Sequence, residues 1–320
     1  MSMKIGVLTS GGDSPGMNAA IRAVVRSATS RGIEVYGIYD GYRGLVENNM
    51  IELTRKSVSD MILKGGTMLG SARLPEFKEE SVQLKAVDVC HQRGIKGLVV
   101  IGGDGTFKGA AALSNLGINC IALPGTIDND IASTDYTIGF DTALNTIVEN
   151  VDKLRDTSSS HHRCSVIQVM GNRCGDLALY AALSTGAEIV ITKETGFDEA
   201  EMLERLRYYE NTKKKNHAIV ILSEKITDAE FLAQKISENT GFSGRATVLG
   251  HIQRGGSPTP FDRILATRMG DKAVERIAAG HRSECICIRD NKIVSIDIDE
   301  ALSMTNPSRK ELFELHDRLI

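Results

Sequence analysis

The feature that most constrains the fold is a regular alternation of short apolar runs with stretches of helical periodicity. In the N-terminal part, turn residues follow each of the runs KIGVLTS, EVYGIYD, GLVVIGG and NCIALPG. Between the first two runs, apolar positions in 17–31 recur with the period of a helix, and Arg31-Gly32 supplies a basic last turn and a stop. Strands that alternate with helices form parallel βαβ units, so a doubly wound sheet is predicted here.

A second series of the same kind follows a long helical stretch at 141–156. The apolar runs are CSVIQVMG, EIVITKE, HAIVILSE and RATVLGHI. The helical patterns between them lie at 175–186, 198–212 and 228–240. Turn-rich segments at 139–141 and 255–258 separate the two series. We therefore expect an α/β protein with two doubly wound (Rossmann-like) lobes and an active-site cleft between them, at the C-terminal ends of the strands.

Charge and composition exclude several classes of protein. The chain carries 38 Lys and Arg against 41 Asp and Glu, a net charge of −3, which argues against a general nucleic-acid or membrane-surface binder. No apolar run approaches the ~20 residues that span a bilayer, and MSMKIGVLTS lacks the pattern of a signal peptide. The six cysteines contain no CxxC pair, so reduced, mostly buried thiols and a cytoplasmic location are expected.

Three glycine-rich segments follow apolar runs of the first series: SGGDSPGMN at 10–18, GSAR at 70–73 and GGDGT at 102–106. Glycine lets backbone N–H groups approach an anion closely, and a helix that follows adds its positive end. None of the segments contains the Gly-Lys-Ser/Thr of a Walker A loop. A tight strand-to-helix turn explains any single segment equally well, but three such segments favour binding of a polyphosphate.

Asp104 lies inside GGDGT. A carboxylate beside bound phosphates implies a cation between them, and Mg²⁺ takes one or two carboxylates together with phosphate oxygens. The alternative is that Asp104 caps the helix that follows.

The segment PGTIDND, residues 124–130, places Asp128 and Asp130 just after an apolar run. Phosphoryl transfer needs a base for the acceptor hydroxyl and stabilisation of the charge on the moving group. One carboxylate can be the base and the other can help with the metal, while the Thr126 hydroxyl can donate to phosphate or substrate. Asn129 is more simply interpreted as a turn residue.

Basic side chains adjoin the predicted strands of the second series. Arginine is the preferred side chain for two-point contacts with phosphate, although an ordinary surface ion pair explains any single residue equally well. Because all of them flank strands, we expect them to face one cleft and to bind a phosphorylated acceptor. They are Arg163, Arg245, His251 and Arg254.

The motifs TSGGDSPGMNAAIR, GSAR, IGGDGT, PGTIDND, VMG, CGDL and LGHIQRGGSP together resemble those of bacterial ATP-dependent 6-phosphofructokinases over essentially all of residues 3–290. The final segment matches only loosely. The resemblance implies phosphorylation of fructose 6-phosphate by ATP with Mg²⁺, the committed step of glycolysis. It implies activation by ADP, inhibition by phosphoenolpyruvate and a homotetramer with shared active sites. The implied lobes are 1–139 plus 257–303 for ATP and 140–256 plus 304–320 for the sugar phosphate.

The resemblance also implies roles for single residues. Asp128 is the expected base, and Asp104 the expected Mg²⁺ ligand with help from Asp130. Arg73 is expected to face both ATP and the transferring phosphoryl group. The other expected ATP contacts are Gly12, Leu74, Gly103, Gly105 and Thr106. The expected sugar-phosphate contacts within the chain are Thr126, Ile127, Asp128, Met170, Gly171, Asn172, Glu224, His251 and Arg254. Arg163 and Arg245 are expected to reach the substrate from a neighbouring subunit.

An effector site for ADP and phosphoenolpyruvate is likewise implied. Arg22 and Arg26 are four residues apart on one helix and lie off its apolar stripe, so they can clasp an anion, although alone they are typical of a solvated face. KKKNH at 213–217 alone is a plain basic turn. The expected effector residues are Arg22, Arg26, Arg55, Asp60, Arg155, Gly186, Glu188, Lys213, Lys215 and His217.

The chain departs from the family pattern at three places. Asn172 stands where the family usually has Arg after VMG, so a contact is lost or is supplied by Arg173. Leu74 replaces the usual aromatic residue after GSAR, and one extra residue lies in the 189–213 region near the effector site. Regulation is therefore harder to carry over than catalysis.

Three rival functions compete with this interpretation. Kinases of NAD or lipids share GGDGT, but PGTIDND and GHIQRGGSP argue against them. The pyrophosphate-using branch of the family usually has Asp and Lys at the positions of Gly105 and Gly125, so these small residues favour ATP. A catalytically silent sensor would lack the base or the metal ligand, and both acids are present.

Overall fold

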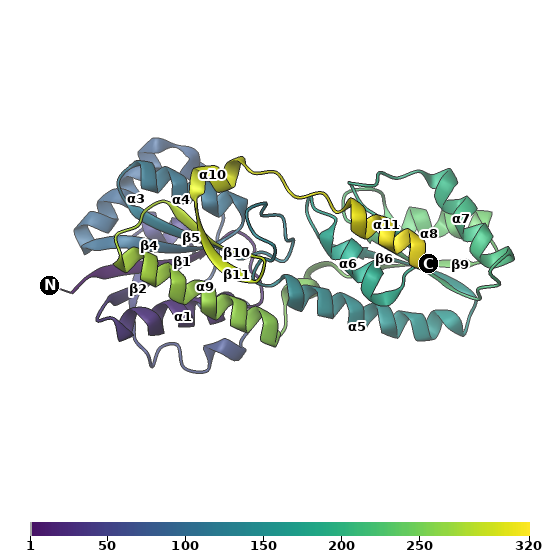
Figure 1. Cartoon of the computed structure of the whole chain (residues 1–320), viewed down its shortest axis with the longest axis horizontal. Helices are drawn as coiled ribbons and strands as arrows, with labels where there is room; N and C mark the ends of the chain where they lie inside the picture. Colours follow the sequence, from purple (N-terminus) through teal and green to yellow (C-terminus); the bar gives the residue numbers. More distant parts are fainter. Residues whose placement is uncertain (1) are drawn as a thin grey trace. The chain divides into compact units, whose positions relative to one another are not determined.

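The computed structural model describes residues 2–320, which divide into two compact units. Unit 1 comprises Met1–Thr142 and Arg254–Asn306, and unit 2 comprises Ala143–Gln253 and Pro307–Ile320 (Figure 1). The divisions lie a few residues from the lobe limits expected from the sequence.

Unit 1 is built on a seven-stranded sheet in the order β11-β10-β5-β4-β1-β2-β3. Its centre is parallel, as the alternating pattern predicts, but β3 and β11 are antiparallel edge strands. The strands are β1 (Lys4–Ser10), β2 (Glu34–Ile38), β3 (Met50–Leu53), β4 (Ile95–Gly102), β5 (Asn119–Pro124), β10 (Glu284–Arg289) and β11 (Lys292–Asp297).

The β10–β11 hairpin departs from the purely parallel sheet that the pattern suggests. Asp290 and Asn291, which connect the two strands, both have positive φ, 49° and 60°. Asn and Asp tolerate this conformation in tight hairpin turns. The antiparallel edge therefore follows from local turn chemistry.

Helices cover both faces of the unit 1 sheet (Figure 1). Side chains alternate along β1, so that Ile5 and Val7 pack in the cluster with α1 and α9, whereas Leu8 packs in the opposite cluster with α3 and α4. The helices are α1 (Met17–Ser30), α2 (Tyr42–Val46), α3 (Glu80–Arg93), α4 (Asp104–Asn115), α9 (Pro260–Ala278) and α10 (Ile298–Ser303). Short 3₁₀ turns lie at Met61–Leu63 and Pro75–Lys78.

Unit 2 contains a four-stranded, fully parallel sheet in the order β7-β8-β6-β9, which confirms the four strands of the second series. They are β6 (Arg163–Val169), β7 (Ile189–Ile191), β8 (Ala218–Ser223) and β9 (Ser243–Val248). The helices are α5 (Phe140–Ser159), α6 (Asp176–Thr185), α7 (Glu199–Asn211), α8 (Ala229–Asn239) and α11 (Lys310–Leu319). Of these, α5 begins in unit 1 and continues into unit 2.

The C-terminal helix α11 belongs to unit 2, where Arg309 forms an ion pair of 2.8 Å with Asp176. His316, buried on the same helix, hydrogen-bonds the Ala187 carbonyl at 2.8 Å. The six cysteines are free and buried, as expected. Within residues 2–320, no helix is both long enough and apolar enough to cross a bilayer.

Candidate active site

The ends of β1, β4 and β5 bring three predicted loops together. The strands run parallel, and Gly102 pairs with Ser10 on one side and with Pro124 on the other. The segments SGGDSPGMN, GGDGT and PGTIDND therefore leave the sheet side by side at its C-terminal edge. This is the edge at which parallel α/β sheets bind their ligands.

Hydrogen bonds connect these loops to each other and to GSAR. The Thr9 hydroxyl donates to the Gly70 carbonyl at 2.7 Å, and the Thr106 hydroxyl donates to the Ser10 carbonyl at 3.1 Å. The Gly125 N–H donates to the Gly102 carbonyl at 3.0 Å. Because each bond fixes backbone rather than a surface side chain, the loops are held in a defined arrangement before any ligand binds.

Arg254, predicted to contact the sugar phosphate, lies against the first glycine-rich loop. A Cβ added at Gly12 would come within 3.0 Å of an Arg254 guanidinium nitrogen, Nη1. The buried Nε of Arg254 has no hydrogen-bond partner among the residues that the structure describes. A buried donor of this kind is costly unless a ligand satisfies it, so Arg254 is suited to bind an anion at this loop.

The PGTIDND loop is shaped by Asn129, which has a φ of +52°. Its side-chain amide donates to the Asp135 carbonyl at 3.2 Å and accepts from the Thr137 N–H at 3.0 Å. This confirms its interpretation as a turn residue. Asp128 is partly buried, and its N–H donates to the Thr126 hydroxyl at 3.2 Å.

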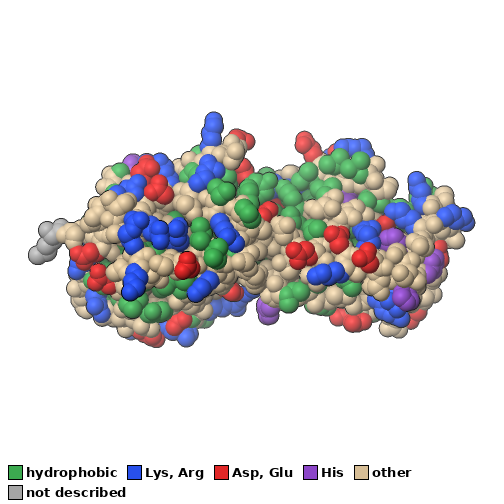
Figure 2. All heavy atoms as spheres, turned by 90° about the horizontal axis from the view of Figure 1, so that it is seen from below, with side chains coloured by type: hydrophobic (Ala, Val, Ile, Leu, Met, Phe, Trp, Pro, Cys, Tyr) green, Lys and Arg blue, Asp and Glu red, His purple; other side chains and the backbone are tan. Residues whose placement is uncertain are grey.

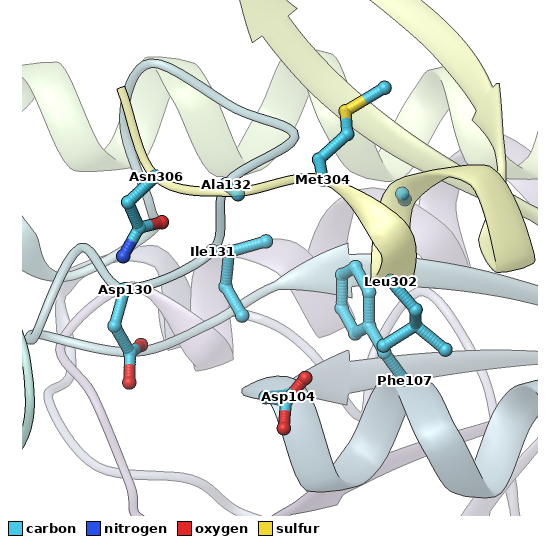
Figure 3. Close-up of a pocket in the computed structure, with 9 residues that line it drawn as sticks. Asp104, Phe107, Asp130, Ile131, Ala132, Leu302, Met304 and Asn306 are labelled. Carbon is cyan, nitrogen blue, oxygen red and sulfur yellow. The ribbon is translucent and has the colours of Figure 1, made fainter. Parts of the chain in front are cut away.

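Asp104 and Asp130 line a common pocket of about 160 Å³. Figure 3 shows both carboxylates low in the view, with Met304 and Asn306 above them. The remaining lining side chains are mostly apolar, from α4, from the loop after β5 and from the segment around α10. The last segment, 301–306, was not among the expected site residues, and its sequence carries no recognisable motif.

Asp104 does not cap α4. The N-cap is Gly103, and Asp104 is the first residue of the helix. Its carboxylate accepts a hydrogen bond of 2.6 Å from Lys108, and both side chains are about half exposed. An acid so placed can accept a cation, which would share the carboxylate with Lys108 or displace it.

The two glycines used to distinguish phosphoryl donors have different surroundings. Beyond its chain neighbours and the backbone of its own helix turn, a Cβ at Gly105 would meet no heavy atom of the described residues within 4 Å, whereas a Cβ at Gly125 would lie 2.9 Å from Ile101 and 3.3 Å from Met17. Gly125 is therefore required by packing over β4. Space for a nucleotide is indicated by Gly105 alone, so only one of the two glycines distinguishes the donors.

The C-terminal edge of the unit 2 sheet also gathers predicted residues. The Glu224 N–H donates to the Val169 carbonyl at 2.9 Å, which joins the segments that follow β6 and β8. The Asn172 N–H donates to a Glu224 carboxylate oxygen at 2.9 Å. Met170 and Gly171 lie between these contacts, and exposed His251 follows β9.

Gln253 is a positioning residue that the sequence did not reveal. It is fully buried, and its Oε1 accepts a hydrogen bond of 3.1 Å from the Met170 N–H. Its amide nitrogen donates to the Gly250 carbonyl at 2.9 Å. A buried glutamine with both ends satisfied fixes the VMG turn, and only its location in LGHIQRGG hints at this role.

Arg163 and Arg245 do not lie at this edge, so the expectation that the basic residues of this series face one cleft is wrong within a single chain. Arg163 is the first residue of β6, and Ser165 pairs with Arg245 in β9. Arg163 therefore lies at the N-terminal edge of the sheet, and Arg245, the third residue of β9, lies two residues in from that edge. Figure 2 shows Lys, Arg and His side chains gathered at the right-hand end of unit 2, where α5 finishes.

The expected ATP contact Arg73 is the last residue of GSAR, and Leu74 follows it directly. Arg73 is exposed, and its carbonyl accepts from Arg43 at 3.1 Å. Leu74 is partly buried and packs on the cluster that contains Phe107. The aliphatic side chain of Leu74, which replaces the usual aromatic residue, therefore has a defined packing position.

Most of the expected effector residues fall into one cluster in each unit, whereas Lys213 lies over the ring of Tyr208. In unit 1, burial and repulsion by Arg26 and Arg55 lower the pKa of Arg22, while Asp60 opposes them. In unit 2, buried Glu188 accepts from Lys215 at 2.6 Å and from the Ile219 N–H at 2.7 Å.

Other members of the unit 2 cluster lie close to Glu188. Burial lowers the pKa of His217, with Glu188 acting in the opposite direction and Arg155 adding to the lowering. Arg155 donates to the Thr185 carbonyl at 2.6 Å, next to Gly186, which ends α6 with a φ of +63°. The unit 2 cluster is therefore predominantly cationic around one buried acid.

A buried carboxylate, Asp262, ties α9 to the start of α5. It accepts hydrogen bonds from the Gly139 N–H at 2.9 Å, the Thr142 N–H at 2.8 Å and the Thr142 hydroxyl at 2.6 Å. Burial raises the pKa of Asp262 to about 6, although these hydrogen bonds act to lower it. Thr259 caps α9 and donates to Asp141 at 2.6 Å, so the two helix starts are joined reciprocally.

Comparison with known proteins agrees with this architecture. A family model described as phosphofructokinase matches residues 4–277. The curated ATP-dependent 6-phosphofructokinase of Photobacterium profundum is 56% identical, and that of Vibrio vulnificus is 55% identical, each over 100% of both chains.

Solved structures show the same fold. Phosphofructokinase from Saccharomyces cerevisiae has a TM-score of 0.90 at 32% identity over 98% of this chain, which spans 50% of the yeast chain. A pyrophosphate-dependent phosphofructokinase from Marinobacter aquaeolei has a TM-score of 0.87 at 21% identity, covering 96% of this chain and 86% of that one, a likeness of fold alone. Given the family-model match and the full-length relatives, the chain belongs to the phosphofructokinase family, as its motifs predicted.

Proposed function

We propose that the protein transfers the terminal phosphoryl group of ATP to the 1-hydroxyl of D-fructose 6-phosphate, giving fructose 1,6-bisphosphate and ADP in the cytoplasm. The observation that carries this proposal is the register of β1, β4 and β5. It sets two glycine-rich turns and the PGTIDND loop with Asp128 at one sheet edge, to which the GSAR turn is hydrogen-bonded through Thr9. Identity of 56% to a curated ATP-dependent enzyme over the full length also supports it.

Asp128 is the proposed base. As the 1-hydroxyl oxygen attacks the γ-phosphorus, the hydroxyl proton passes to the Asp128 carboxylate and the bond to the ADP oxygen breaks. A positioned base typically contributes ~10²–10⁴-fold. The Thr126 hydroxyl, next to the Asp128 N–H, is suited to orient the acceptor or a phosphate oxygen.

Arginines supply charge for the phosphoryl group. The unsatisfied Nε of Arg254 and its place against Gly12 support contact with an anion there. Exposed Arg73 ends the GSAR turn, so its side chain is accessible to a nucleotide. Planar guanidinium groups match phosphate oxygens in two-point contacts.

Asp104 and Asp130 fit a Mg²⁺ ion bound with the nucleotide. Their carboxylate oxygens are hard ligands that line one pocket. No group of three His, Cys, Asp or Glu suited to a metal occurs among residues 2–320, but Mg²⁺ with ATP needs only one or two carboxylates beside phosphate oxygens. When bound, the ion would offset the negative charge of the phosphates.

Open space at Gly105 supports ATP as the donor. An acidic side chain at this position would enter that space, whereas a substitution at Gly125 would first meet Ile101 and Met17. The choice between ATP and pyrophosphate is therefore proposed to depend chiefly on Gly105.

Unit 2 is proposed to bind the sugar phosphate through Met170, Glu224 and His251, near the C-terminal edge of its sheet. Arg163 lies at the other edge, and Arg245 lies two residues in from it. Seven residues of β6 span about 20 Å at the usual rise of a strand. One small sugar phosphate cannot bridge this length to Arg163, and Arg245 stands only two residues further along its strand, so the two arginines are proposed to serve the site of a neighbouring subunit in a homotetramer.

Regulation by ADP and phosphoenolpyruvate is proposed through the two effector clusters. The cationic side chains around Glu188 and the pair Arg22 and Arg26 can each bind phosphate oxygens. Phosphoenolpyruvate is expected to raise the fructose 6-phosphate concentration needed for half-maximal rate, and Arg155→Ala to abolish this response. A wild-type enzyme insensitive to both effectors would contradict it.

The function is tested by supplying fructose 6-phosphate with ATP or pyrophosphate and coupling the product to aldolase. ATP is expected to support turnover, and phosphorus NMR should show a new phosphate ester at C1. Turnover with pyrophosphate and none with ATP would overturn the donor. No turnover with ATP and any of several hexose phosphates would overturn the function.

A further inference from the structure

Two adjacent turns at the C-terminal edge of the unit 2 sheet hold a lysine that no motif singled out. Val169 at the end of β6 pairs with Ser223 at the end of β8. Just beyond these residues, Lys225 donates a hydrogen bond of 2.8 Å to the Asn172 side-chain oxygen. Asn172 in turn donates through its N–H to Glu224 at 2.9 Å. The lysine is therefore part of the same hydrogen-bonded group as a predicted substrate residue.

Both turns adopt an unfavourable backbone conformation. Asn172 has a φ of +55° and Lys225 a φ of +67°. Asparagine is often found there, but lysine has no local means of stabilising the left-handed region. A single exposed hydrogen bond contributes too little to stability to explain why a lysine is held in this way. Strained residues of this kind gather at binding and catalytic sites.

The ammonium group retains capacity for a ligand. Lys225 is exposed, and within residues 2–320 its hydrogen-bond acceptor is the Asn172 oxygen. An ammonium has three donors, so further donors remain available in the turn that also presents Glu224. The neighbouring cation Arg173 is exposed and forms no hydrogen bond or ion pair within the same residues.

We propose that Lys225 contacts a phosphoryl oxygen of the substrates, that Asn172 positions its ammonium group, and that Lys225 rather than Arg173 supplies the positive charge at this turn. The inference rests on the proposed function and adds a substrate-contacting residue to it. The oxygen belongs either to the 6-phosphate of the sugar or to the phosphoryl group in transfer. Both have the same chemistry, and steady-state kinetics separate them.

The test compares Lys225→Met with Lys225→Arg and Arg173→Met. Lys153→Met, on the exposed side of α5, is the control for loss of an unrelated lysine. Loss of a charged hydrogen bond is expected to cost Lys225→Met ~10–100-fold in kcat/KM. Lys225→Arg should recover most of this loss, and Arg173→Met and Lys153→Met should stay within about two-fold of wild type.

The kinetic constants identify the oxygen. A raised KM for fructose 6-phosphate with unchanged kcat indicates the 6-phosphate, whereas a lowered kcat with unchanged KM values indicates the phosphoryl group in transfer. Asn172→Ala should show the same pattern as Lys225→Met with a smaller loss, because the ammonium remains but is no longer held.

Calorimetric titration of each folded variant with fructose 6-phosphate gives a second readout that needs no turnover. Far-UV circular dichroism and thermal unfolding identify the folded variants. Lys225→Met kinetics within about two-fold of an active wild type, or a loss in Arg173→Met that Lys225→Met lacks, would overturn the inference. A folded wild type without turnover would instead count against the proposed function.

Discussion

The sheet of unit 1 gathers its site residues at one edge, whereas the sheet of unit 2 divides its residues between both edges. In unit 1, Gly102 pairs with Ser10 and Pro124, and the loops beyond them are hydrogen-bonded to each other. In unit 2, Glu224 lies beyond the ends of the strands, whereas Arg163 lies at the start of β6. The direction of the parallel strands thus determines which charged side chains of one chain lie together at the same edge of a sheet.

The two regions also differ in what they are expected to contribute, which is the chemical step in unit 1 and substrate binding at the N-terminal edge of the unit 2 sheet. The unit 1 loops are fixed by hydrogen bonds to backbone carbonyls and present acids, which suits them to the chemical step. The N-terminal edge of the unit 2 sheet presents long cationic side chains with few contacts: Arg245 donates at 2.8 Å to the carbonyl of Gly244, its neighbour in the chain. Substitutions in the first region should lower kcat, and those in the second should raise KM.

The largest expected effect is at Asp128. Asp128→Ser removes the proposed base and should lower kcat by at least ~100-fold, with little change in the KM values. Asp135→Asn, in the same loop and bonded to the Asp290 N–H, is the control and should leave kcat within about two-fold. Steady-state rates from the aldolase-coupled assay measure kcat for both variants. An Asp128→Ser enzyme with wild-type kcat would contradict the assignment of Asp128 as the base.

The next effect is at Arg245. Arg245→Ser should raise the KM for fructose 6-phosphate by ~10–100-fold, since a charged hydrogen bond to phosphate is lost, while the KM for ATP should not change. Equal changes in both KM values would show that the N-terminal edge does not specialise in the sugar phosphate.

Much of the unit 1 edge could be predicted from the sequence, because strand ends and glycine-rich turns are local signals and parallel pairing aligns them. The separation of Arg163 from His251 could also be predicted in principle, since Arg163 precedes the run CSVIQVMG, whereas His251 lies at the end of the run RATVLGHI. In a parallel sheet, a residue before a strand and a residue after a strand lie at opposite edges, although both flank strands.

Other features depend on tertiary packing that no local pattern carries. Gln253 fixes Met170 from a different part of the chain, and the surroundings of a Cβ at Gly125 are set by Ile101. The pocket wall at 301–306 is brought to Asp104 by the fold alone. Asp262 has a local signal, because Thr259 and Asp262 show a Thr-x-x-Asp spacing that resembles a capping box.

A third prediction concerns the pH dependence of stability at the start of α5. The pKa of Asp262 is raised by burial to about 6 in the folded chain, against ~3.9 for an exposed Asp. Stability from this group is therefore fully present below pH ~4 and is lost as the pH rises through ~6, by up to ~3 kcal/mol.

Asp262→Asn should remove that dependence. Denaturant unfolding at several pH values between 4 and 7 gives the unfolding free energies of wild type and variant. Their difference reports on Asp262, because the contributions of all other groups cancel in it. A difference that stays constant with pH would show that Asp262 does not titrate as proposed.

The smallest expected effects compare two glycines of the unit 1 edge. Gly125→Ala places a methyl group 2.9 Å from Ile101 and should cost ~1–3 kcal/mol of unfolding free energy through overpacking. Gly105→Ala, in α4 with open space around its Cβ, should be neutral or stabilising by less than ~1 kcal/mol. Equal losses in chemical denaturation would contradict the different packing of the two sites.

The most direct test of the central claim, that one chain does not complete its own acceptor site, is the activity of mixed oligomers. Asp128→Ser and Arg245→Ser chains are unfolded together, refolded at equal amounts and assayed at low fructose 6-phosphate, where each parent alone is nearly inactive. If Arg245 serves a neighbouring subunit, random mixing creates sites with both wild-type residues and should restore about a quarter of wild-type activity. A mixture no more active than the mean of its refolded parents would contradict the claim.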